Sequence, residues 1–136
     1  MFTKIKKMKI LSINYSIIKN GFIKKFSYVS IHRSNLSLLF LDVLVREGVI
    51  RGYRPLISNK IQVFLKYHKG RSVITNIKAI SSSSRSIYFS LEDILYWKNL
   101  RSSGYSFLII NSSKQVYSSN ELYKHKIGGQ VLCIIN

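Results

Sequence analysis

GYSFLIINSSKQVYSSNELYKHKIGGQVLCIIN, residues Gly104–Asn136, is the stretch that decides how this chain folds. Its pattern predicts a strand (Tyr105–Ile110), a polar loop (Asn111–Gln115), a short helix, a Gly128-Gly129 turn and a last strand (Gln130–Ile135). Two apolar strands of this kind pair with each other, so we expect the polar loop at one edge of a sheet. The loop offers hydroxyls, amides, one cation and no acid, which suits phosphates and the hydrogen-bonding edges of bases.

The charge of the chain points to a polyanionic partner. Among 136 residues, 22 are Lys or Arg and 5 are Asp or Glu, which gives a net charge of +17. Solubility needs a net charge of only about 2–8 in a small domain. Apolar residues make up 46% of the chain, so it contains enough material for a core. Nucleic acid is therefore the first expected partner, and an anionic membrane surface is the second.

Several classes of site find no support in the sequence. Cys133 is the only cysteine and lies in an apolar strand, which favours a buried thiol over a disulfide or thiolate zinc site. The three histidines are scattered without metal-ligand spacing. The phosphate-binding and nucleophile motifs of common enzymes are absent. We expect no enzyme activity, no cofactor, no metal and no small-molecule substrate, and no apolar run is long enough to span a membrane.

The amino-terminal half predicts two helices and short strands. Apolar residues at helical spacing indicate a first helix over Lys9–Lys19, which Asn20-Gly21 is expected to end. Phe26–Ile31 has the composition of a strand. Ser34 is the expected N-cap of a second helix, and Gly48 is expected to close it.

A β-rich middle and a serine run follow. Arg51–Arg54, Ile61–Tyr67 and Val73–Ile80 predict strands, with a basic turn at His68–Arg71. Ser81–Ser84 has the composition of a linker. The expected organisation is therefore an amino-terminal αβ lobe (residues 1–80), a Ser-rich linker (81–85) and a carboxy-terminal, β-rich lobe (86–136) that binds nucleic acid.

Basic and aromatic residues alternate after the linker. Arg85 precedes the short predicted strand that contains Tyr88, and Glu92-Asp93 suit the first turn of a following helix. An exposed Tyr88 would stack on an unpaired base, while Arg85 and Lys114 would bind phosphates. We therefore expect Arg85, Tyr88 and Lys114 to contact nucleic acid.

Motifs along nearly the whole chain, in order, resemble one family. They are Ile18-Lys19-Asn20-Gly21, Ser34 before an apolar helix, Arg46-Glu47-Gly48-Val49-Ile50, Leu65-Lys66-Tyr67, Ser86-Ile87-Tyr88 and Ile127-Gly128-Gly129-Gln130-Val131-Leu132-Cys133. This set is similar to small-subunit ribosomal protein eight, of the bacterial and organellar type. The resemblance implies an α+β fold of two small lobes. The first packs two helices on a short sheet, and the second is mostly β with one short helix.

The resemblance also implies a function and a set of RNA contacts. Members are structural constituents of the small ribosomal subunit that bind a central-domain helix of its RNA, beside neighbouring proteins, and support assembly. Asn111, Ser112 and Ser113 stand in the family's hydroxyl-rich loop, and Gln130 stands where a Glu is usual. Lys19 and Asn20, in the first motif, complete the expected RNA contacts. Gln115 departs from the pattern, because the family carries a glycine there.

Two other functions stay open at this point. A basic first helix would suit a protein that lies on a membrane surface, and a free RNA-binding protein could regulate translation of a message that resembles the ribosomal site. The composition is rich in Ile, Lys, Asn, Tyr and Phe, with one Ala and one Pro. Such residues follow A/T-rich codons, as in organellar genomes, so we expect a mitochondrial ribosome, with a plastid ribosome as the alternative.

Overall fold

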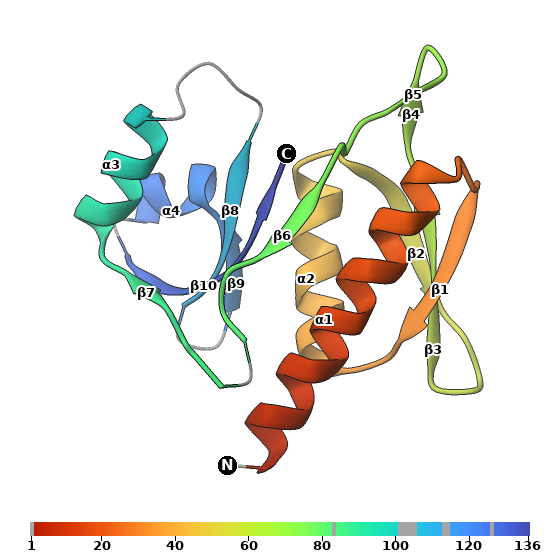
Figure 1. Cartoon of the computed structure of the whole chain (residues 1–136), viewed down its shortest axis with the longest axis horizontal. Helices are drawn as coiled ribbons and strands as arrows, with labels where there is room; N and C mark the ends of the chain where they lie inside the picture. Colours follow the sequence, from red (N-terminus) through yellow and green to blue (C-terminus); the bar gives the residue numbers. More distant parts are fainter. Residues whose placement is uncertain (1, 83, 101–105, 113–114, 126) are drawn as a thin grey trace.

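The computed structural model describes residues 2–82, 84–100, 106–112, 115–125 and 127–136 (Figure 1). In chain order its elements are α1 (Phe2–Ile23), β1 (Tyr28–His32), α2 (Asn35–Arg46), β2 (Ile50–Pro55), β3 (Lys60–Leu65), β4 (Tyr67–His68), β5 (Arg71–Ser72), β6 (Ile77–Ala79), β7 (Tyr88–Phe89), α3 (Leu91–Leu100), β8 (Phe107–Ser112), β9 (Gln115–Ser118), α4 (Ser119–His125) and β10 (Gly129–Ile135). Helices and antiparallel sheets together form an α+β fold, which confirms the expected class.

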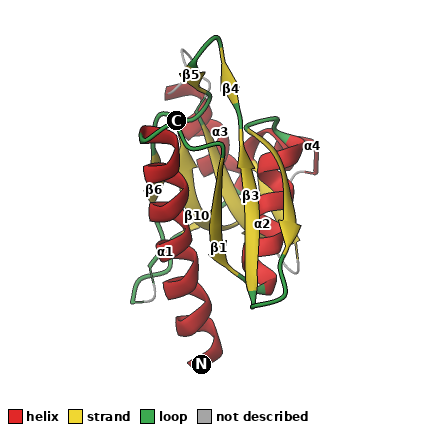
Figure 2. Cartoon of the chain, turned by 90° about the vertical axis from the view of Figure 1, so that its right-hand side faces the viewer, coloured by secondary structure: helices red, strands yellow, loops and turns green. Residues whose placement is uncertain are grey.

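The amino-terminal part is a three-stranded antiparallel sheet with helices on one face. Its strand order is β1-β3-β2. In β1, Val29 and Ile31 are buried while their neighbours are not, and β3 alternates in the same way. The buried side chains form one core with α1 and α2, and both helices lie on the same side of this sheet (Figure 1). In the described part of the chain, no helix lies over the opposite face of this sheet, which is turned toward the viewer in Figure 2.

The first helix continues past the point where the sequence predicts its end. The prediction that Asn20-Gly21 terminates it is wrong, because Lys25 is the residue in the left-handed conformation, with φ of 58°. The amide of Phe26 then donates to the Gly21 carbonyl at 2.9 Å, which closes the last turn. Gly21 serves packing instead: a Cβ there would lie 2.4 Å from Cγ1 of Val29 on β1.

The second helix has the ends that the sequence predicts. The Ser34 hydroxyl accepts a hydrogen bond of 3.1 Å from the amide of Ser37, which confirms the N-cap. Gly48, with φ of 76°, follows the C-cap residue Glu47. The basic turn also forms, since β4 and β5 pair across Lys69 and Gly70, both with positive φ.

The carboxy-terminal part is a five-stranded antiparallel sheet built around β10. The order is β6-β10-β8-β9, and β7 pairs with the early part of β10. One face contributes Ile109 and Cys133 to the core shared with α1 and α2. The other face buries Leu108 and Val131 in a second core with Ile94 of α3 and Leu122 of α4.

The closing stretch contains one strand more than expected. β8 and β10 pair, as predicted, but Asn111 and Ser112 belong to β8 instead of a loop. Gln115 begins β9, which pairs back on β8 with Ser112 opposite Gln115. The polar stretch is therefore a hairpin. Asn111 and Ser112 have low strand propensity, so nothing in the sequence indicated that they continue the apolar strand.

The serine run is anchored at its first residue. Ser81 is buried, its hydroxyl accepts from the Ile87 amide at 3.0 Å and it donates to the Val131 carbonyl. The strand before it is shorter than the predicted Val73–Ile80, because β6 covers only Ile77–Ala79. β6 pairs with β10, in the carboxy-terminal sheet. The division into two lobes at the serine run stays an interpretation of the sequence.

Candidate nucleic-acid interface

Three of the expected RNA-contact residues form a row across the sheet. Gln130 of β10 lies directly opposite Tyr88 of β7 on one side and Asn111 of β8 on the other. Directly opposed residues of antiparallel strands point to the same face. Tyr88 is 61% exposed, while Gln130 is 6% exposed and its amide donates to the Ser86 hydroxyl at 3.3 Å. An aromatic ring and two amides thus stand side by side.

Two glycines permit the close approach of the strands that carry this row. A Cβ at Gly128 would lie 2.4 Å from the Phe89 carbonyl oxygen, and one at Gly129 would lie 2.5 Å from that of Asn111. No side chain fits at such distances, so Gly128-Gly129 brings β7 and β8 against the start of β10. The pair therefore acts through backbone proximity and not through the predicted turn, since Gly129 already begins β10 and Gly128 is not assigned to a turn.

The serine loop is only partly described. Ser112 is 4% exposed, and its hydroxyl donates to the Gly128 carbonyl at 2.9 Å, which ties β8 to the residue before β10. Its two lone pairs remain as acceptors, so its contact with RNA stays a prediction. Ser113 and Lys114, also expected to contact RNA, lie outside the described residues.

Arg85 is exposed and held close to the row by the backbone. The Ser82 amide donates to the Arg85 carbonyl at 2.7 Å, and the Arg85 amide donates to the Ser82 hydroxyl at 3.1 Å. The Ile87 carbonyl then accepts from the Val131 amide at 2.8 Å. The segment that carries Arg85 is therefore held beside β10, three residues before Tyr88.

Lys19 and Asn20 lie elsewhere. Both belong to α1 near its carboxyl end, which packs beside β1 on the far side of the molecule from β7 (Figure 1). Asn20 is exposed and lines a groove against β1. The structure therefore brings together Arg85, Tyr88, Gln130 and the described loop residues, and it separates the α1 pair from them.

The acidic residues are mostly engaged within the fold. Asp42 accepts from the Tyr53 hydroxyl at 2.5 Å, which raises the pKa of Tyr53 to about 12. Glu121 pairs with Arg46 at 3.1 Å, the single ion pair among the described residues. Glu47 accepts from Ser118, and the Asp93 carboxylate accepts from the Ser90 hydroxyl, which caps α3 by accepting from the Asp93 amide. The net charge of +17 already counts all five acids, so this excess of cations is left for an external polyanion.

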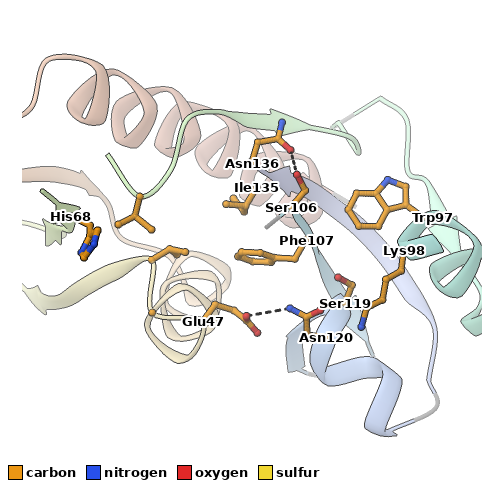
Figure 3. Close-up of a pocket in the computed structure, with 13 residues that line it drawn as sticks. Glu47, His68, Trp97, Lys98, Ser106, Phe107, Ser119, Asn120, Ile135 and Asn136 are labelled. Atoms are coloured by element: carbon orange, nitrogen blue, oxygen red, sulfur yellow. Dashed lines mark hydrogen bonds between the residues drawn. The ribbon is translucent and has the colours of Figure 1, made fainter. Parts of the chain in front are cut away.

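A cavity of about 560 Å³ lies between the end of α2 and the carboxy-terminal strands (Figure 3). Phe107 and Trp97 provide apolar walls. Its one carboxylate, Glu47, is bound to the Asn120 amide at 3.4 Å, and the Ser106 hydroxyl donates to Asn136 at 2.7 Å. These groups satisfy one another and do not converge on a reacting atom.

The described part of the chain contains neither a candidate metal site nor an accessible thiol. Within it, no group of three or more His, Cys, Asp or Glu side chains could hold a metal ion. Cys133 is buried, and burial raises the pKa of its thiol to about 12, which keeps it protonated. The predicted burial of this thiol is confirmed. None of the described helices has the length and apolarity to cross a membrane.

Sequence reasoning missed the residues that hold the row in place. Ser81 and Ser86 make hydrogen bonds to Val131 and Gln130, which are 50 and 44 positions away. Such long-range partners carry no local signal. β9 could have been found, because Val116 and Tyr117 have strand propensity, but the expected helix was placed close to them.

Comparison with known proteins agrees with this architecture. Residues 10–136 match the family described as Ribosomal protein S8. The small ribosomal subunit protein uS8 of Wolinella succinogenes is 32% identical over 130 residues, covering 93% of this chain and 96% of the relative. Those of Hyphomonas neptunium and Rhizobium meliloti are 34% and 35% identical, covering 85% and 87% of this chain and 88% and 89% of theirs. The resemblance of the ordered motifs is confirmed: the chain belongs to the Ribosomal protein S8 family.

Proposed function

We propose that this protein is a structural, non-catalytic constituent of the small ribosomal subunit that binds a central-domain helix of the subunit's RNA and supports its assembly. Family membership is the main support. The observation that carries the mechanism is the row of Tyr88, Gln130 and Asn111 across β7, β10 and β8. An aromatic face and amides beside exposed cations match what folded RNA offers: bases, hydroxyls and phosphates.

Each part of the interface has its own task. Arg85 and Lys114 supply phosphate contacts, which give affinity without sequence information. Tyr88 stacks on an unpaired base, while Asn111 and Gln130 hydrogen-bond base edges or ribose hydroxyls. Ser112 and Ser113 position the hairpin on the RNA backbone. The amide of Gln130 donates as well as accepts, and unlike a carboxylate it is not repelled by phosphate.

Binding of a synthetic central-domain helix tests this interface. Tyr88→Ala is expected to weaken binding by about 1–3 kcal/mol through loss of stacking. Tyr96→Ala is the matched control, since Tyr96 is an exposed tyrosine on α3 and does not belong to the row across β7, β10 and β8. Gel-shift titrations at one salt concentration give both affinities.

An unchanged affinity of the Tyr88→Ala variant would contradict the proposed interface. If Tyr88→Ala bound the helix like the wild type, the row would not be the contact surface, whatever the family. If the wild-type protein failed both to bind the helix and to sediment with small subunits, the proposed function would fall as a whole.

We also propose that the ribosome in question is mitochondrial. The support is composition: one Ala and one Pro, with many residues that follow A/T-rich codons. Immunoblotting of purified organelles is the test. Recovery with mitochondrial small subunits is the expected result, and recovery with plastid small subunits would contradict it.

A further inference from the structure

The uncovered face of the β1-β3-β2 sheet carries an aromatic row. Tyr28 of β1 lies directly opposite Phe64 of β3, and Phe64 lies opposite Gly52 of β2. The two rings are 6.4 Å apart between centroids and tilted by 57°. Tyr28 is 51% exposed even though it sits in a strand beside a packed core.

Gly52 leaves the third place in this row empty. A Cβ built there meets nothing within 4 Å. Since Gly52 pairs directly with Phe64, its missing side chain opens a shelf beside the half-buried ring of Phe64. A planar group would lie on this shelf against the rings without displacing protein atoms.

The next row along the strands is polar and basic. Gln62 of β3 lies between Ser30 of β1 and Arg54 of β2. The guanidinium of exposed Arg54 donates to Oε1 of Gln62 at 2.8 Å, which holds both side chains on the face. Lys60 continues the basic edge beside His32, with 3.2 Å between Nζ and Nδ1. The three strands, YVSIH, IRGYRP and KIQVFL, contain no acid.

A groove continues the aromatic row around the edge of β1. It has a volume of about 380 Å³ and lies between β1 and the end of α1. It is lined by Tyr28 and Ser30 of β1, by Asn20 of α1, and by Lys24 and Phe26 in the segment between the two elements. Tyr28 therefore belongs to both the sheet face and the groove, with cations on either side.

We propose that this face is a second RNA site that stacks one or two unpaired bases on Tyr28 and Phe64. Arg54 and Lys24 hold the flanking phosphates, and Gln62 bonds to a base edge. Aromatic rings on a sheet, rimmed by cations and lacking acids, are how proteins hold single strands. The proposal rests on the proposed function only in taking RNA as the partner, since β1–β3 lie outside the carboxy-terminal interface.

The test uses the full chain and an eight-nucleotide, fluorescein-labelled oligouridylate, followed by fluorescence anisotropy. Saturating unlabelled central-domain helix is present, so that the carboxy-terminal interface is occupied. We expect the wild type to bind the oligonucleotide. Tyr28→Ala should weaken this binding about tenfold or more, and Tyr28→Phe, which keeps the ring, should bind like the wild type.

A second variant keeps both rings. Gly52→Leu should fill the shelf and weaken oligonucleotide binding to a similar degree, while thermal unfolding stays like that of the wild type. Neither variant should change the affinity for the central-domain helix by more than about twofold, whereas Tyr88→Ala should affect that affinity alone. Helix binding therefore reports on the proposed function, and oligonucleotide binding reports on this site.

Three results would overturn the site. One is a wild-type protein that does not bind the oligonucleotide while still binding the helix, and another is Tyr28→Ala with wild-type oligonucleotide affinity. The third comes from ultraviolet crosslinking of intact small subunits: crosslinks from Tyr28 to a neighbouring protein, with none to RNA, would make this face a protein interface.

Discussion

The Ser118 hydroxyl donates a hydrogen bond of 2.5 Å to the Glu47 carboxylate, although the two residues are 71 positions apart. Ser118 also accepts from the Glu121 amide at 3.3 Å, and Glu121 pairs with Arg46. Two contacts, Glu47 with Ser118 and Arg46 with Glu121, therefore join the carboxyl end of α2 to the beginning of α4. One buried serine serves as cap for a helix and as donor to a carboxylate.

Removing this hydroxyl should loosen the junction. Ser118→Ala is expected to lower the free energy of unfolding by about 1–3 kcal/mol, because Glu47 loses a buried donor and α4 loses its cap. Urea unfolding followed by circular dichroism measures the change. Ser58→Ala, at an exposed turn between β2 and β3, is the control and should leave stability unchanged within about 0.5 kcal/mol.

A buried amide makes a second test of the core. Asn14 of α1 donates to the His32 carbonyl at 3.0 Å and to Ser37 Oγ at 2.7 Å, and it accepts from the His32 amide at 3.0 Å. Asn14→Ala should cost about 1–3 kcal/mol for each group left unsatisfied. Asn20→Ala, on the exposed side of the same helix, should cost little. Equal stability of the two variants would contradict the network.

The thiol of Cys133 gives a prediction in pH. Burial raises its pKa to about 12, whereas the unfolded thiol ionises near pH 8.5. Above that pH the folded state binds more protons, so the free energy of unfolding should fall as the pH rises from about 8.5. Cys133→Val should show a shallower fall between pH 8 and 9.5. Native Cys133 should also resist thiol reagents at pH 8 until denaturant is added.

Glycine substitutions separate close approach from open space. Gly129→Ala places a Cβ 2.5 Å from the Asn111 carbonyl oxygen, so we expect a loss of about 1–3 kcal/mol from strain between β8 and β10. Gly52→Ala meets nothing within 4 Å and is the control. Thermal unfolding of both variants is the measurement. A stable Gly129→Ala protein would show that the strands separate without cost.

Salt dependence distinguishes charge from stacking at the RNA interface. Arg85→Ala should reduce the slope of log affinity against log salt by about one unit, because one phosphate contact is lost. Tyr88→Ala should lower affinity with the slope unchanged. Titrations between 50 and 200 mM salt provide both values. An unchanged slope for Arg85→Ala would mean that this guanidinium does not touch a phosphate.

Local patterns in the sequence were sufficient for the elements whose signals are local. The Ser34 cap and the pairing of β8 with β10 follow from capping chemistry and from the apolar composition of the two strands. The end of α1 was predicted wrongly because glycine has two uses. At Gly21 the need for contact with Val29 outweighed its capping tendency, and Lys25 adopted the left-handed conformation instead.

The site was less accessible to sequence reasoning. Tyr88, Gln130 and Asn111 could each be proposed, but their alignment depends on the register of three strands. The Tyr28–Phe64–Gly52 row was missed for the same reason, since its members are separated by sequence and meet only through pairing. Register is set by packing across the whole sheet and by bulges such as the one between Val131 and Cys133.

The position of β10 has a consequence for synthesis on the ribosome. All three strands of the β1-β3-β2 sheet have been translated once residue 65 is added, so this sheet has its full set of strand partners early. β6, β7 and β8 each pair with β10, which is translated after all of them. The edges of these strands that pair with β10 stay unpaired until Gly129–Ile135 has been translated. During this interval the nascent chain is most exposed to pairing with wrong strands.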